Sequence, residues 1–223
     1  MPKPLSTMKV FKFALISFAF ISLFSSCIEH EVIPPPTNNV DLNASLVGYV
    51  NGTQFELTQN VNGYKATTSD TAVVLTSPTL SKVIYSSTIY STQNAQALTL
   101  TFGTLDYDAS ANTEPTLAMF NDWHMTNSGI PILFKDQATM VAQSVDGVQV
   151  TYTDNSGKVW YSRETDPGQV ANFTILKQAS DGTGDYSLFE ATFSCKVWYV
   201  DPQTSVESSL DITNAKYRAW FKR

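Results

Sequence analysis

Histidine and cysteine are nearly absent from this chain. Two of each occur among 223 residues. A histidine-based metal centre or a Ser-His-Asp arrangement would have to use His124, because His30 lies in a proline-rich stretch, and no catalytic motif surrounds His124. A lone histidine between large apolar side chains is more often structural than catalytic. The sequence therefore predicts no catalytic residue and a protein that is not an enzyme.

Charge is also sparse. Only 15% of the residues are charged, and the net charge is −6. The three lysines of residues 1–12 precede Cys27 and every acidic residue follows it, so cleavage before Cys27 would make the net charge −9. An acidic surface argues against binding to nucleic acid and against electrostatic docking to anionic lipid. Abundant Thr, Ser, Asn and Tyr are typical of β-rich exported proteins.

The longest uncharged apolar run is too short to span a bilayer. It covers residues 13–24, whereas a spanning helix needs about 20 residues. Lysines before it and small residues after it are typical of a secretory signal, which begins at Met1 or Met8. Leu23-Phe24-Ser25-Ser26-Cys27 resembles the lipobox of bacterial lipoproteins. The resemblance implies a signal peptide over residues 1–26 and an acylated Cys27 held in a lipid bilayer. An ordinary secretory signal with a chance cysteine is the alternative.

Residues 27–39 predict a tether. Pro34-Pro35-Pro36 favours extended polyproline II between polar flanks, which would hold a domain off a membrane surface. No aspartate follows Cys27, so the lipoprotein resemblance implies an outer-membrane protein that faces the periplasm or the cell surface. Residues 40–223 predict a single β-rich domain without an internal boundary.

Strand patterns dominate this domain, and they include predicted strands over residues 71–76, 210–212 and 216–222. Residues 45–50 and 53–57 flank Asn51-Gly52, which favours a type I′ hairpin. Residues 186–200 form the longest strand candidate, and every second residue is apolar on one face: Phe189, Ala191, Phe193, Cys195, Val197 and Tyr199.

Residues 114–125 predict one short helix, with Pro115 at its first position and Thr113 or Glu114 as its cap. Together the patterns predict a mainly β fold: a single antiparallel β-sandwich or open barrel with one short helix.

Two further motifs support that architecture. Val50-Asn51-Gly52-Thr53-Gln54-Phe55 opens the domain, and the segments 193–199 and 212–217 close it with Phe-Ser-Cys-Lys-Val-Trp-Tyr and Ile-Thr-Asn-Ala-Lys-Tyr. This layout resembles the small β-rich lipoproteins of Bacteroidota, although Ala215 stands where that family usually has Gly. The resemblance implies a fold and a location, and no activity.

Cys195 predicts a small buried hydrophobic residue, because it shares a face with Phe193 and Val197. If Cys27 is acylated, Cys195 has no disulfide partner; if Cys27 is not, a Cys27–Cys195 bridge remains open.

Asp181-Gly182-Thr183-Gly184-Asp185 is a candidate calcium site. Asp181 and Asp185 would supply carboxylate oxygens on a glycine-rich turn, although calcium needs six to eight oxygen ligands. The alternative is that Asp and Gly are here only because they favour turns. No other cofactor is predicted.

Trp160, Trp198 and Trp220 occupy polar-face positions of their predicted strands. If those strands are neighbours, the three rings would line one surface suited to a glycan or to a protein partner. The alternative is that this face is covered, or that one register is shifted by a residue.

The sequence thus predicts a membrane-anchored lipoprotein with a non-catalytic binding domain for a glycan or an envelope protein. A structural component of an envelope assembly is the second hypothesis. A hydrolase is the third, and it would need two convergent carboxylates that no motif here provides.

Overall fold

A computed structural model describes residues 39–223 of the chain. The predicted signal peptide, Cys27 and the tether up to Asn38 lie outside the described residues. The strands are β1 (Ser45–Val50), β2 (Thr53–Thr58), β3 (Tyr64–Val73), β4 (Ser81–Ser91), β5 (Ala97–Tyr107), β6 (Pro131–Leu133), β7 (Gly147–Thr153), β8 (Val159–Ser162), β9 (Val170–Asp181), β10 (Gly184–Val200) and β11 (Glu207–Lys222). The helices are α2 (Leu117–Thr126) and α3 (Gln137–Gln143).

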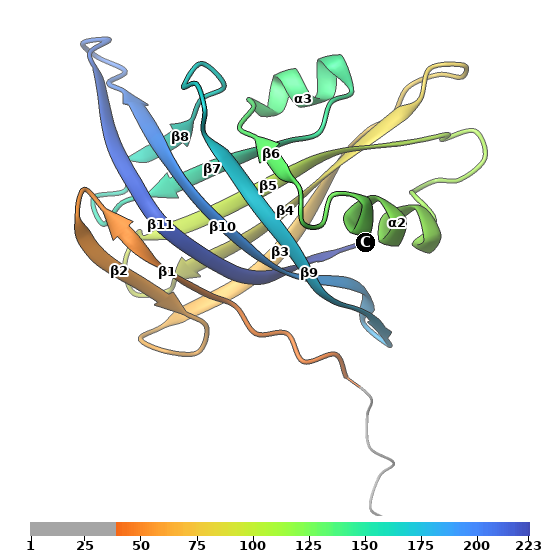
Figure 1. Cartoon of the computed structure of the whole chain (residues 1–223), viewed down its shortest axis with the longest axis horizontal. Coiled ribbons are helices and arrows are strands. Elements are labelled where there is room, and N and C mark those ends of the chain that lie inside the picture. Colours follow the sequence, from red (N-terminus) through yellow and green to blue (C-terminus); the bar gives the residue numbers. More distant parts are fainter. Residues whose placement is uncertain (1–38) are drawn as a thin grey trace, which may run out of the picture. The chain divides into compact units, whose positions relative to one another are not determined.

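All eleven strands belong to one antiparallel sheet. Its main order is β2-β1-β11-β10-β8-β7-β5-β4-β3, with β9 beside β10 and the short β6 beside β9. The sheet curls into a half-barrel, as Figure 1 shows. This confirms the predicted mainly β, open-barrel type of fold. The curl brings strands together that are distant in the sheet order. For example, the hydroxyl groups of Ser87 on β4 and Tyr217 on β11 lie 3.1 Å apart in the interior.

Aromatic rings fill the concave face. Phe102 on β5 stacks on Phe173 of β9 at 4.8 Å between ring centroids, and Phe189 stacks on Phe221 at 4.4 Å. All four rings are almost completely buried. Burial of each such side chain stabilises the folded state by about 1.5–3 kcal/mol. The cluster therefore stabilises the curled form of the sheet, because its rings come from strands on both sides of the interior.

Helix α2 covers part of this aromatic core. It turns Phe120 and His124 inward, and Trp123 stacks on Phe102 at 4.2 Å. The predicted helix is therefore confirmed, but its predicted cap is wrong. Thr116 is the N-cap, and its hydroxyl accepts a hydrogen bond from the Met119 backbone N–H at 3.2 Å. Thr116 can do this because a capping oxygen reaches the third residue after it.

Helix α3 is a second helix, which the sequence patterns did not predict. It has seven residues and buries only Met140, so it has too little amphipathic pattern to be recognised. Met140 approaches the start of β7 closely, since a Cβ on Gly147 would lie 3.0 Å from Met140 Cγ.

Two strand predictions also need correction. Residues 71–76 were expected to be extended, but β3 spans Tyr64–Val73. Residues 210–212 and 216–222 belong to the single strand β11. A bulge explains the interruption, because Thr213 and Asn214 together face Ser194 of β10. A bulge shifts the alternation of side chains by one residue.

Candidate functional site

Trp160 lies on the concave face. It is opposite Tyr152 on β7, its ring is 5.5 Å from that of Tyr199, and it is 6% exposed. Its indole N–H donates to Asp154 Oδ2 at 3.1 Å. The predicted polar face of β8 therefore points into the half-barrel, so Trp160 does not share a surface with the other two tryptophans.

Trp198 and Trp220 lie on the convex face, but differ in exposure. Trp220 is opposite Leu188 and is only 5% exposed. Trp198 is opposite Tyr161 of β8 and is partly exposed. The three tryptophans therefore do not form one exposed surface, and that hypothesis is wrong. Trp160 and Trp220 are buried, as the alternative of a covered face predicted, and of the three only Trp198 remains a candidate ligand-binding ring.

Asp181 accepts hydrogen bonds within its own turn and from the start of the domain. Its Oδ1 accepts from the Thr183 backbone N–H at 2.7 Å, and its Oδ2 accepts from the Val40 N–H at 2.7 Å. The Thr183 hydroxyl, followed by these backbone groups, lowers the pKa of Asp181 to about 2. Asp181 therefore holds the entering chain against the β9–β10 hairpin.

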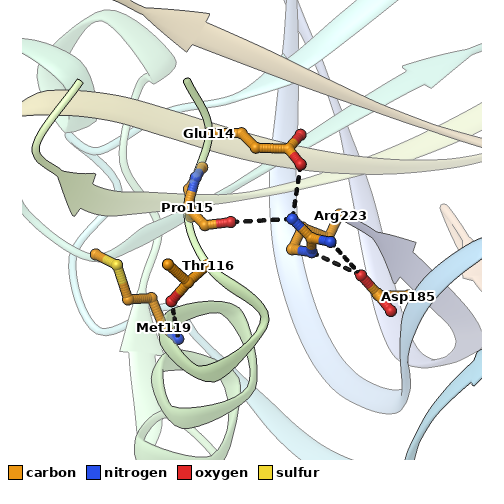
Figure 2. Close-up of polar contacts among 6 residues, drawn as sticks. All are labelled: Glu114, Pro115, Thr116, Met119, Asp185 and Arg223. Carbon is orange, nitrogen blue, oxygen red and sulfur yellow. Dashed lines mark hydrogen bonds and ion pairs between the residues drawn. The ribbon is translucent and has the colours of Figure 1, made fainter. Parts of the chain in front are cut away.

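Asp185 has a different partner. Figure 2 shows Arg223 between Asp185 on one side and Glu114 and Pro115 on the other. Arg223 Nε donates to Asp185 Oδ2 at 2.7 Å, and Nη1 donates to Glu114 Oε1 at 2.7 Å. The carboxylates proposed for calcium therefore have separate partners. Within residues 39–223 no group of three or more His, Cys, Asp or Glu side chains is arranged to hold a metal ion.

The convex face carries a cleft of about 660 Å³ at the β11 bulge, which we call the outer cleft. Exposed Asn172, Thr192 and Asn214 contribute to its lining, as do Gln169, Ser194 and Lys216. The Ser194 hydroxyl accepts from the Asn214 backbone N–H at 3.0 Å and so holds the bulge. Amide and hydroxyl groups both donate and accept hydrogen bonds. The outer cleft can therefore bind a polar, uncharged group.

The loop between β8 and β9 links this cleft to Trp198. Gln169 Oε1 accepts from the Lys196 backbone N–H at 3.0 Å, and Asp166 Oδ2 accepts from the Trp198 indole N–H at 2.7 Å. Trp198 lines a smaller cleft of about 330 Å³ with the exposed Tyr161 and with Arg163. The Arg163 guanidinium lies 4.8 Å from the centroid of the Trp198 ring. An aromatic pair therefore follows the outer cleft along β10.

Cys195 and His124 are both buried, so the prediction of Cys195 as a buried residue is confirmed. Cys195 has a free thiol, and burial raises the pKa of that thiol. His124 is enclosed by aromatic rings, and burial lowers the pKa of its imidazole to about 4. Its Nδ1–H donates to the Phe120 carbonyl at 2.8 Å, and its Nε2 has no hydrogen-bond partner among the described residues.

The structure also brings two carboxylates near each other that no motif indicated. Burial, and after it the charge of Glu164, raises the pKa of Asp136. Asp136 is the N-cap of α3, whereas Glu164 lies in the loop after β8. Sequence patterns did not indicate this carboxylate pair or the outer cleft, because the residues of each come from segments that are distant in the sequence. The outer cleft combines residues of three strands and a loop, and its only local signal was Asn214, which interrupts a strand pattern.

Comparisons with protein-family models, curated proteins and solved structures found no match. No helix within residues 39–223 is long and apolar enough to cross a membrane.

Proposed function

We propose that this chain is an outer-membrane lipoprotein, anchored through acylated Cys27, whose β-rich domain is a non-catalytic module that binds a glycan. The outer cleft carries the proposal. Its amide and hydroxyl side chains suit the many hydroxyl groups of a sugar, and Tyr161 with Trp198 offers apolar ring surface farther along β10. The lipobox resemblance supports the anchor, and the proline-rich segment supports a tether.

Asn214 provides a sharp test, because its backbone φ is 50° and glycine accepts that conformation without strain. Asn214→Gly therefore removes the amide from the cleft and keeps the bulge. Asn62→Gly is the matched control, since Asn62 has φ 49° in the turn before β3. We expect Asn214→Gly to weaken retention on the bound polysaccharide about five- to tenfold, the equivalent of one hydrogen bond, and Asn62→Gly to leave it unchanged.

The measurement is retention of the protein on an array of neutral and acidic polysaccharides, read together with tryptophan fluorescence. Trp198 is the only one of the convex-face tryptophans that is partly exposed, so Trp198→Phe should remove any ligand-induced spectral shift. Failure of the wild-type protein to bind any glycan would overturn the proposal. If Asn214→Gly and Asn62→Gly changed glycan binding equally, the outer cleft would not be the glycan-binding site.

An envelope-protein partner is the second candidate, and a different surface favours it. A groove of about 700 Å³ lies between α3 and strands β3, β4, β7 and β8, where Val73 and Val141 contribute apolar lining and Tyr161 forms part of the border. Exposed apolar surface of this kind marks protein contacts. Ala138→Lys places a charge in the groove, whereas Ala118→Lys places one on the exposed face of α2. Cross-linking to an envelope protein that Ala138→Lys alone abolishes would favour this candidate.

A further inference from the structure

A second cleft lies on the same convex face, beside the outer cleft. Its volume is about 530 Å³, and its lining includes Lys177 of β9, Leu188 of β10, Arg218 of β11 and Asp41 from the start of the domain. We call it the basic cleft. Leu188 and Thr192 of the outer cleft are four residues apart on β10, which places the clefts about 13 Å apart along the strand. One extended ligand can therefore reach both.

The cations of this face differ in their partners. Lys216 Nζ lies 3.0 Å from Glu190 Oε1, and Lys196 Nζ lies 3.7 Å from Asp211 Oδ1. Lys177 and Arg218, by contrast, have no carboxylate oxygen within 4.0 Å in the described part of the chain. Both cations that line the basic cleft are therefore without an ion pair.

The basic cleft is positive in a chain whose net charge is −6. Its one carboxylate belongs to Asp41, whose Oδ1 accepts from the Asn43 amide at 2.6 Å. Leu188 and the exposed Leu176 add apolar surface between the cations. An arginine fork matches a carboxylate geometrically, and a lysine supplies a second point charge. This combination suits an anionic group carried on a ring with an apolar face.

We infer that the basic cleft binds a carboxylate of an acidic, uronate-type polysaccharide that lies along β10 and also occupies the outer cleft. The inference rests on the proposed glycan-binding function and names the class of glycan. A glycan fits better than an anionic lipid headgroup, because the basic cleft continues the convex face that carries the outer cleft.

The test uses the complete mature protein and matched pairs of probes. Polygalacturonate, alginate and hyaluronan are each compared with their carboxyl-reduced, neutral counterparts. We expect at least one acidic probe to bind about tenfold more tightly than its neutral counterpart, with an affinity that falls as salt is raised. Lys177→Gln and Arg218→Gln should each remove most of that preference. Lys65→Gln is the control, because Lys65 is an exposed cation on β3.

The outcomes separate this inference from the function on which it rests. Asn214→Gly should weaken acidic and neutral probes alike, since it acts in the outer cleft. Equal binding of acidic and neutral probes, or unchanged binding by Lys177→Gln and Arg218→Gln, would overturn the inference and leave the glycan function standing. Absence of all glycan binding overturns both. Binding to phosphatidylglycerol vesicles that is lost in Lys177→Gln and Arg218→Gln, without a preference for acidic glycans, would assign the cleft to a lipid headgroup and also overturn the inference.

Discussion

His124 makes stability depend on pH in a defined window. Burial lowers the pKa of the folded imidazole from 6.5 to about 4, so the unfolded chain binds the proton more tightly. The free energy of unfolding should therefore fall as pH drops from 6.5 to 4, by about 3 kcal/mol in total. His124→Phe keeps an aromatic ring against Phe221 and should flatten this dependence, as measured by urea unfolding at several pH values.

Asp181 provides an internal control for that measurement, because it titrates at lower pH than His124. Hydrogen bonds lower the pKa of Asp181 to about 2, so its stabilising effect is present above pH 3.8 and is lost only as pH falls toward 2. That loss should persist in His124→Phe. An unchanged slope between pH 4 and 6.5 in the variant would contradict the role assigned to His124.

Cys195 should be unreactive in the folded protein. It is 4% exposed, and burial raises the pKa of its thiol, so little thiolate is available to attack a reagent. In a Cys27→Ala background, we expect a thiol reagent to label Cys195 only as fast as the protein unfolds, and rapidly in denaturant. Fast labelling without denaturant would show that this part of β10 opens locally.

At the scale of elements, the contact between α3 and β7 depends on Gly147. A Cβ there would lie 2.8 Å from Lys135 Cβ and 3.0 Å from Met140 Cγ. Gly147→Ala should therefore destabilise the fold by about 1–3 kcal/mol through overpacking. Gly182→Ala is the control, because nothing lies within 4 Å of its added Cβ. Equal denaturation midpoints for the two variants would mean that α3 can shift away without cost.

The Arg223 cluster links the start of α2 to the β9–β10 hairpin. The Asp185 side chain is 16% exposed, whereas that of Glu114 is 62% exposed. An ion pair with a partly buried carboxylate contributes more to the free energy of unfolding than one with an exposed carboxylate. Asp185→Asn should thus cost about 1–3 kcal/mol and speed hydrogen exchange in the first turn of α2, and Glu114→Gln should have a smaller effect. Equal effects of both variants on thermal unfolding would contradict this ranking.

At the scale of the whole molecule, membrane attachment should depend on one cysteine. If Cys27 carries the proposed acyl chain, that chain supplies the membrane-binding energy, and we expect Cys27→Ala to move the protein to the soluble fraction and to remove the acyl mass from its N-terminal peptide. Cys195→Ala is the matched control and should stay attached. A Cys27→Ala variant that still fractionates with membranes would contradict anchoring by acylation.

Local patterns predicted much of the sheet. The alternation in residues 186–200 placed Phe189, Phe193 and Val197 on the buried face, as observed in β10. Asn51 and Gly52 have φ values of 47° and 78°, as the predicted hairpin requires. Such features depend on neighbours in sequence, because alternation and turn conformation are properties of a short backbone segment.

The sequence by itself therefore determined the β class, the main hairpin and the presence of α2. Only the tertiary structure decided which face is covered in strands such as β8, where large apolar side chains occur on both faces. Trp160 and Trp198 were both predicted on the polar faces of their strands, yet Trp160 points into the half-barrel and Trp198 points outward. Alternation separates two faces without naming the inner one, and the curl of the sheet makes that choice through contacts between distant strands. The outer and basic clefts depend on the same contacts, so no local pattern indicated them.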